Sequence, residues 1–261
     1  NNQNYDLAVK EKNNAENIGK VLYPNDSNDE GKLLRLKQQY FFVSASLQDI
    51  VRNYKKTASP FDYFAEYHAI QLNDTHPTVA IPELMRILTQ EENISWDKAW
   101  EIVIKTFAYT NHTLLAEALE QWPVRLYKSL LPNIFDIIVK INNQLMEELE
   151  EKGIYNSAKY EYEIIQHDSI KMAHLAIYGS KSINGVAKIH SELIKDRELN
   201  QWYRIYPQKF SNKTNGVTQR RWLLQSNPEL AGLFTELLGS DEWIVDLSRL
   251  KELEKYINDE N

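Results

Sequence analysis

The sequence predicts a helix-rich α/β fold in which part of the sheet is missing. Most of the 261 residues lie in segments whose apolar side chains recur at helical spacing. Only a few short apolar runs have the length of a strand, and polar turns separate them from the helices. No internal repeat or low-complexity tract is present. The length fits one large domain or two small ones.

Composition indicates a globular protein and argues against several function classes. A hydrophobic content of 43% with 11% aromatic residues is enough for a core. The formal net charge of −7 argues against binding to nucleic acid. Cysteine is absent, so disulfides and thiolate metal sites are excluded, which fits a reducing, cytoplasmic compartment. No apolar run reaches about 18 residues, so no membrane span is expected.

The two ends of the chain lead us to expect a piece of a longer protein. The sequence begins with Asn1 rather than Met and ends in a charged, helical segment. The first residues carry neither a basic stretch nor an apolar one, so no signal peptide is expected.

The first part of the chain is predicted to hold one long helix and one strand. Residues 1–20 are polar and fit a partial helix or an arm, and 23–31 is a run of turn formers. The segment 32–56 carries an apolar stripe typical of a long helix. A short apolar run at 69–73 then predicts a strand.

The rest of the chain is mainly helical by the same criteria. Pro132 is suited to the start of a helix and Gly153 to its end. The apolar run 170–178 fits a buried strand or a short helix, and 210–222 reads as a loop followed by more helix with a break at Asn227. Helices are predicted at 78–91, 96–107, 115–130 and 131–152, and after 185.

A polar turn directly follows the strand at 69–73. Asn73, Asp74, Thr75 and His76 place an amide, a carboxylate, a hydroxyl and an imidazole side by side, and Pro77 then opens a helical run. In α/β folds, ligands bind beyond the carboxyl ends of the strands. The alternative is a helix cap formed by Asp74 or Thr75 with an ordinary loop histidine.

Four polar loops share this character, at 25–29, 73–76, 109–113 and 213–219. Each lies between apolar elements, and together they supply the planar donors and acceptors that sugar hydroxyls need. Taken singly, such a loop is more typical of a turn or a helix cap. None contains a phosphate-binding or dinucleotide-binding glycine motif, and the chain has only 8 glycines.

The histidines allow a metal site as an alternative. His68, Asp74, His76 and His112 could supply ligands, but there is no HExxH motif, and His68 should point away from His76 because it precedes the strand. His174 lies in an apolar segment and fits a buried core histidine, and His190 fits a structural role on a helix. No Gly-x-Ser-x-Gly element indicates a serine nucleophile.

Read together, ten segments resemble the α-glucan phosphorylases, the family of glycogen, starch and maltodextrin phosphorylases. They occur in family order over about 20–250, which makes the resemblance specific. The segments are VLYPND (21–26), EGK (30–32), LRLKQQYF (34–41), 69–86, WDKAW (96–100), AYTNHT (108–113), EALEQWP (117–123), MAHL (172–175), NGVAKIHS (184–191) and 212–222.

The resemblance implies a two-domain fold of the GT-B type with a deep cleft. It implies reversible phosphorolysis of terminal α-1,4-linked glucose to glucose 1-phosphate, with retention, in an enzyme that uses pyridoxal phosphate. Residues 1–219 would be the later part of the N-terminal domain and 220–261 the start of the cofactor-bearing domain. The cofactor's lysine would lie outside this chain. The expected partners are α-1,4-glucan and inorganic phosphate, and the full-length enzyme would be a cytoplasmic homodimer.

By the same resemblance, the catalytic residues are Asp74 and His112, and His112 would bond the sugar. Asp74 and His76 would lie beside the anomeric side of the glucose pocket, and Asp26 on a mobile gate loop. Fixed dipoles and exclusion of water suit such a reaction. The substrate-binding residues implied are Asp26, Asn73, His76, Asn111, Val186 and Asn215.

Some positions depart from the family pattern. Ser27 and Gln219 replace the residues usual there, and Arg52-Asn53 stands where AMP-activated animal enzymes carry two arginines, which argues against strong AMP control. We expect the isolated chain to be inactive. The alternatives are a carbohydrate-binding module without chemistry and a metal-dependent hydrolase.

Overall fold

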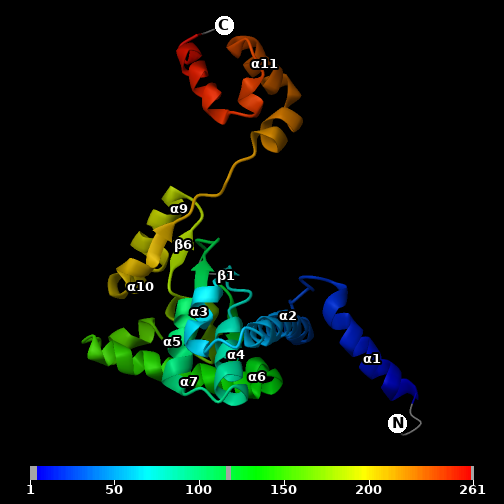
Figure 1. Ribbon diagram of the computed structural model, residues 1–261, viewed down its shortest axis with the longest axis vertical. Helices are drawn as coiled ribbons and strands as arrows, with labels where there is room; N and C mark the ends of the chain where they lie inside the picture. Colours follow the sequence, from blue (N-terminus) through cyan, green and yellow to red (C-terminus); the bar gives the residue numbers. More distant parts are fainter. Residues whose placement is uncertain (1–4, 116–118, 260–261) are drawn as a thin grey trace. The chain divides into compact units, whose positions relative to one another are not determined.

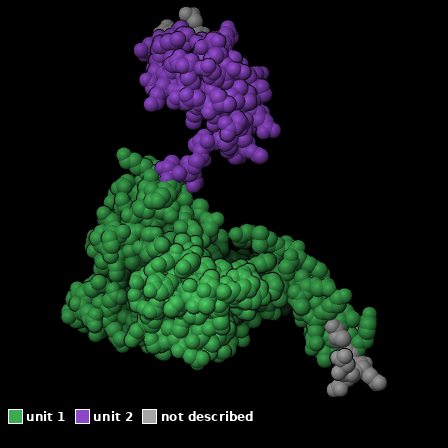
Figure 2. All heavy atoms as spheres, in the orientation of Figure 1, with its two compact units in different colours: residues 1–213 green, residues 214–261 purple. Residues whose placement is uncertain are grey.

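The computed structural model describes residues 5–115 and 119–259, except for the side chains of residues 6 and 8. The chain divides into two compact units, residues 1–213 and 214–261, which Figure 2 shows in different colours. The helix-rich α/β class predicted from the sequence is confirmed for the first unit, because helices surround a parallel sheet there (Figure 1). Among the described residues, no helix combines the length and apolar character needed to cross a bilayer.

The main sheet has four strands in the order β1-β2-β6-β7, and all neighbouring pairs are parallel. The predicted strand at 69–73 is β1, and it pairs with β2 from Ile70–Phe107 to Asn73–Thr110. The other three strands were not predicted. The bounds are β1 Ile70–Asn73, β2 Phe107–Thr110, β6 Ile183–Gly185 and β7 Phe210–Asn212.

The long helix predicted at 32–56 is α2, Asp29–Lys55, and it begins three residues earlier than expected. Its start is capped by Asn28, whose side chain accepts a hydrogen bond from the Gly31 backbone N–H at 2.8 Å. Gly31 has no substitute there, because a Cβ would lie 1.9 Å from the backbone oxygen of Asn25. A side chain at position 31 would therefore clash with the segment that precedes α2.

The helices that follow β1 form the core layer of the first unit. The predicted helix 78–91 is α4 (Ala80–Arg86) continued by the π-helical turn η2 (Ile87–Glu91), and 96–107 is α5 (Trp96–Thr106). The predicted helix 131–152 is α7 (Pro132–Glu151), with Pro132 in its first turn. Gly153 follows it with φ of 79°, as expected of a glycine stop. Helix α4 packs on both α5 and α7 (Figure 1).

The helix predicted at 115–130 is wrong at residues 115 and 119–123, which are not helical. Residues 116–118 lie outside the described residues, and so do Glu117 and Ala118 of the resemblance segment 117–123. Gln121–Pro123 forms β3, and the helix α6 starts only at Val124 and ends at Leu130. Pro123 explains the difference, because a proline disfavours helical backbone in the residue before it.

A small antiparallel sheet orders the strands β3-β5-β4, with β5 at Ser169–Lys171 and β4 at Ile165–Gln166. The apolar run 170–178 is compatible with a strand or a helix. The structure contains both, because α8 (Met172–Tyr178) follows β5 directly. The remaining elements of this unit are α1 (Tyr5–Lys20), η1 (Phe61–Tyr63), α3 (Phe64–Tyr67), η4 (Asn156–Glu161), α9 (Lys188–Leu193), η5 (Ile194–Glu198), α10 (Asn200–Ile205) and η6 (Pro207–Lys209).

The second unit is helical and is built around the buried Trp243. Gln219, one of the departures from the family pattern, is buried there and donates from Nε2 to the backbone oxygen of Ile244 at 2.7 Å. The break predicted at Asn227 is the cap of α11, which accepts from the Leu230 N–H. The elements are η7 (Arg220–Gln225), α11 (Pro228–Leu238), η8 (Glu242–Ile244) and η9 (Leu247–Tyr256).

A buried carboxylate joins α2 to α4. Glu83 has no exposed surface, and its oxygens accept hydrogen bonds from Tyr40 at 3.0 Å and Ser44 at 2.7 Å, both on α2. Arg86, one turn further along, donates to both oxygens of Glu83 and also reaches Glu91. This pairing raises the pKa of Arg86. Every oxygen of the buried charge therefore has a partner, as its desolvation requires.

We predict that Glu83→Gln lowers the free energy of unfolding by about 3–5 kcal/mol, because it leaves the Arg86 guanidinium without its buried counter-ion. Urea unfolding followed by far-UV circular dichroism measures the change. The matched control is Glu101→Gln, because Glu101 pairs with Lys98 and Lys105 on an exposed helix face. Equal unfolding midpoints for the two variants would contradict the prediction.

Candidate functional site

The parallel sheet brings most of the predicted site residues to one edge. Because β1, β2 and β6 run in the same direction, their carboxyl ends meet at that edge. Asn73 is the last residue of β1, His112 follows β2 by two positions, and Val186 follows β6 directly. Segments that lie more than a hundred residues apart in the sequence thus end beside one another.

Asn73 and His112 are in direct contact across the ends of β1 and β2. The Nε2 atom of His112 lies 2.5 Å from Oδ1 of Asn73. Because Oδ1 can only accept, Nε2 carries the proton in this arrangement. The hydrogen bond fixes the orientation of the two side chains. Both side chains are exposed, so the pair remains accessible.

The turn after β1 is held by Asp74 and does not cap the next helix. Asp74 has φ of 66°, its N–H donates to Thr110 of β2 at 3.0 Å, and its Oδ1 accepts from the Thr75 N–H at 2.6 Å. Helix α4 starts only at Ala80, and no side chain of the described residues caps it. The cap interpretation of Asp74 and Thr75 is therefore wrong. The carboxylate of Asp74 is half-buried beside the end of the sheet.

Asn111 is buried and connects the strands rather than facing solvent. Its N–H donates to the backbone oxygen of Asn184 at 3.0 Å, and its Nδ2 donates to the hydroxyl of Tyr109 at 3.1 Å. Burial raises the pKa of Tyr109, so the hydroxyl stays neutral. Oδ1 of Asn111 has no partner among the described residues. A direct contact between Asn111 and sugar stays a prediction.

Asp26 is tied to the body of the first unit by Arg35 of α2. Nη1 of Arg35 lies 2.5 Å from Oδ2 of Asp26, and its Nη2 contacts Oε1 of Glu120. Gln39, one turn further along α2, donates to the same oxygen of Glu120 at 2.9 Å. The guanidinium also lies 5.5 Å from the ring centroid of Trp122. Sequence reasoning gave Arg35 no role, because its partner Glu120 lies 85 residues away.

A hollow of about 250 Å³ lies between α2 and the turn after β1. Asn73 and His76 line it from the turn, while Arg35 and Gln39 line it from the helix. The hydroxyl of Tyr23 is 3.4 Å from Nδ1 of His76, and the two rings meet edge to face at 5.6 Å. The hollow therefore connects the predicted turn to the segment that carries Asp26.

Two further predicted residues stand apart from these contacts. Val186 is half-buried, and its N–H donates to Nδ1 of His190 at 3.2 Å. Asn215 belongs to the second unit, so its contact with substrate stays a prediction.

Metal binding finds no support in the placement of the histidines. His68 stacks on Phe64 with ring centroids 4.4 Å apart, and its Nδ1 lies 3.1 Å from the Phe64 backbone oxygen. In the described part of the chain, no group of three or more His, Asp or Glu side chains is placed to hold a metal ion.

Lys209 is a partly buried lysine whose ammonium is held by protein groups. Burial lowers its pKa to about 8. Its ammonium donates to the backbone oxygens of Ile177 and Tyr178 at 3.0 and 3.1 Å and lies over the ring of Tyr206. These contacts give Lys209 a structural role, and it belongs to η6 rather than to the edge where Asn73 and His112 meet.

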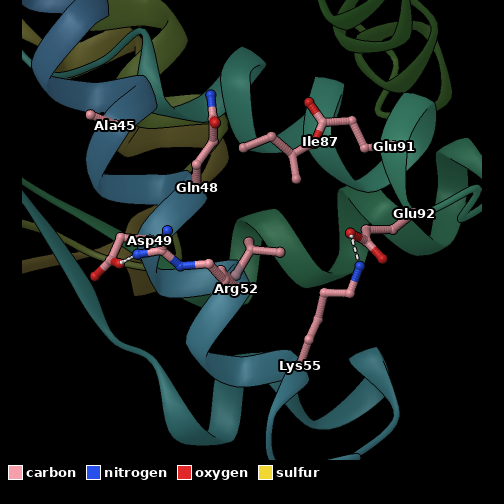
Figure 3. Close-up of a pocket in the computed structure, with 9 residues that line it drawn as sticks. Ala45, Gln48, Asp49, Arg52, Lys55, Ile87, Glu91 and Glu92 are labelled. Carbon is pink, nitrogen blue, oxygen red and sulfur yellow. Dashed lines mark hydrogen bonds and ion pairs between the residues drawn. The ribbon is translucent and has the colours of Figure 1, made fainter.

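A second hollow of about 450 Å³ lies between α2 and η2 (Figure 3). Arg52 lines it, and Asn53, the next residue on α2, lies beside it in the sequence. Arg52 contacts Asp49, and Asn53 donates to the other oxygen of Asp49 at 3.1 Å. Lys55 pairs with Glu92 at 2.7 Å, as the dashed line in Figure 3 marks. The cations of this hollow are thus paired with carboxylates.

The expected core position of His174 is confirmed. It is buried on α8, and its Nδ1 lies 2.8 Å from the backbone oxygen of Glu163, to which it donates. Burial lowers its pKa from 6.5 to about 4. The ring is therefore neutral in the folded protein at pH values where the unfolded chain would bind a proton.

We predict an acid-sensitive component of stability from His174. Because the folded pKa lies below the unfolded one, this component is fully present above about pH 6.5 and is lost as the pH falls towards 4. It amounts to about 3 kcal/mol over that window. Urea unfolding at pH 7, 6 and 5 should show a steeper loss for the wild type than for His174→Asn, which keeps a donor near the Nδ1 position. Parallel losses would contradict the prediction.

Comparison with known proteins places the site in a family context. A family model described as carbohydrate phosphorylase matches residues 1–261. The chain is 54% identical over 250 residues to glycogen phosphorylase 2 of Dictyostelium discoideum, covering 94% of this chain and 25% of that protein. It is 50% identical over 249 residues to glycogen phosphorylase of Bacillus subtilis, covering 95% and 31%. It is 48% identical over 270 residues to the muscle form of glycogen phosphorylase from Bos taurus, covering 98% and 32%. The chain thus spans a quarter to a third of the length of these relatives.

Proposed function

The chain belongs to the carbohydrate phosphorylase family, and on that premise we propose that it is part of a glycogen phosphorylase. The proposed reaction is reversible phosphorolysis of terminal α-1,4-glucosidic bonds, which yields glucose 1-phosphate. The observation that carries the proposal is the contact between His112 and Asn73 at the carboxyl edge of the sheet. It places an oriented imidazole beside amide and carboxylate groups in an accessible position.

The proposed roles follow from the chemistry of these groups. His112 bonds a sugar hydroxyl through a ring whose orientation Asn73 fixes. Asp74 supplies a negative charge beside the anomeric carbon, where positive charge develops in the transition state. His76 completes that side of the pocket, and Val186 and Asn215 contact the sugar.

Access of water is the second requirement, because hydrolysis would compete with phosphorolysis. We propose that Asp26 lies on a gate segment that opens for the glucan and closes over the pocket. The ion pair between Asp26 and Arg35 supports this proposal, because it gives the segment a defined closed position.

The proposed enzyme has two domains of the GT-B type. Residues 1–219 are assigned to the later part of the N-terminal domain and residues 220–261 to the start of the C-terminal domain. The division of the chain into units at residue 213 supports a boundary in this region. Pyridoxal phosphate supplies acid–base chemistry through its phosphate group when bound, and its lysine lies outside this chain. The full-length enzyme is proposed to be a cytoplasmic homodimer that acts on α-1,4-glucan and inorganic phosphate.

We predict that the full-length protein forms glucose 1-phosphate from glycogen and phosphate, while the isolated 261-residue chain does not. The chain supplies His112 and Asp74 without a cofactor lysine, so it holds one side of the site only. A coupled assay with phosphoglucomutase and glucose 6-phosphate dehydrogenase measures both proteins. Product from the isolated chain, or none from the full-length holoenzyme, would refute the proposal.

In the full-length enzyme, His112→Asn should lower kcat/KM by about 30-fold or more, because the shorter side chain loses the sugar contact. The matched control is His167→Asn. His167 is an exposed histidine with φ of 49° in a turn, a conformation that Asn tolerates. It should leave kcat/KM unchanged. Equal losses for the two variants would show that His112 has no special role.

A further inference from the structure

His190 is a buried histidine to which the proposed chemistry assigns no role. It is the third residue of α9 and is only 9% exposed. Its Nδ1 accepts a hydrogen bond from the N–H of Val186 at 3.2 Å. Its Nε2 has no hydrogen-bond partner among the described residues. The ring therefore makes its hydrogen bond to the turn that follows β6.

The contact completes the start of α9. Ala187 occupies the cap position and has no polar side chain, so it cannot accept from the first turn. His190 reaches back from the third helical position to the N–H before the cap, one residue beyond the N-cap N–H that Glu or Gln reaches in a capping box. Gly185 makes this approach possible, because a Cβ there would lie 2.6 Å from Nδ1 of His190.

The hydrogen bond also defines the protonation state of the ring. An Nδ1 that accepts from a backbone N–H carries no proton, so the neutral ring holds its proton on Nε2. Burial, and then the charge of His112, lower the pKa of His190 and favour this neutral form. A charged ring would carry a proton on Nδ1 and could no longer accept the hydrogen bond from the Val186 N–H.

The turn held by His190 is continuous with the edge that carries His112. Asn184 precedes the turn, and its backbone oxygen accepts from the N–H of Asn111, the neighbour of His112. Its side-chain oxygen accepts from Thr110 at 2.9 Å, at the end of β2. Two hydrogen bonds thus join the end of β2 to the segment that His190 fixes at its other end.

We propose that His190 is a positioning residue that holds the backbone of Val186 at the sugar pocket through its unprotonated Nδ1. The inference rests on the proposed function, since that function gives Val186 its contact with the sugar. His190 itself need not touch the substrate. It acts by fixing the position of the Val186 backbone.

Two substitutions in the full-length enzyme test whether the hydrogen-bond acceptor at Nδ1 matters, or only the size and polarity of the side chain. His190→Asn places a carbonyl oxygen near the position of Nδ1, whereas His190→Gln places its amide near Nε2. We expect His190→Gln to raise the KM for glucose 1-phosphate about tenfold with kcat within about threefold, and His190→Asn to stay within about threefold of the wild type. Ser191→Ala is the control on the same helix, because Ser191 lies 2.9 Å from the Ala187 backbone oxygen and makes no hydrogen bond to Val186.

Hydrogen–deuterium exchange, read by mass spectrometry on peptides that contain Val186, gives a second readout that needs no activity. The Val186 amide should exchange faster in His190→Gln and remain protected in His190→Asn. Equal exchange in the two variants, or an equal rise in KM, would overturn the inference. If the wild-type holoenzyme lacks phosphorolysis, the proposed function fails, and the exchange comparison still decides whether His190 holds Val186.

Discussion

The parallel alignment of β1, β2 and β6 is the constraint on which the candidate site depends. The register pairs Asn73 with Thr110, and Thr110 with Asn184, so β1 and β2 end at the same level and β6 ends one residue later, at Gly185. Short polar segments can then meet there without long loops. The contact between His112 and Asn73 and the bond from Asn111 to Asn184 follow directly from this register.

The edge is stabilised by neutral hydrogen-bonding groups more than by ion pairs. Amides and hydroxyls of Thr110, Asn111 and Asn184 link neighbouring strands, and Tyr109 stays neutral because burial raises its pKa. His112 and His190 each have one ring nitrogen fixed by a specific partner, a side chain in one case and a backbone N–H in the other. Fixed dipoles of this kind need little reorganisation when a polar ligand binds. The buried charge of Glu83 lies deeper, where it joins helices.

The sequence predicts the long helices well and the short strands poorly, for a physical reason. Helix α7 has a sustained apolar period and clear boundary residues, so Pro132 and Gly153 mark it correctly. Strand β2 begins at Phe107 directly after α5 ends at Thr106, and its three apolar residues followed by Thr110 carry no period that separates strand from helix. The residue types at 73–76 predict a polar turn after the strand, and the structure has a turn there. The partner of Arg35, Glu120, lies 85 residues away, and no local pattern contains such a tertiary contact.

Arg35 is shared between a shielded contact, to Glu120, and the proposed gate segment that carries Asp26. Its contact with Glu120 is largely shielded from solvent, since the Glu120 side chain is 6% exposed, and Gln39 and Trp122 support the same arrangement. Its contact with Asp26 is the weaker one, because the Asp26 side chain is 43% exposed and water can replace the guanidinium at small cost. The proposed gate segment can therefore leave while Arg35 stays on Glu120. Because Arg35 keeps its place, the segment has the same partner each time it returns.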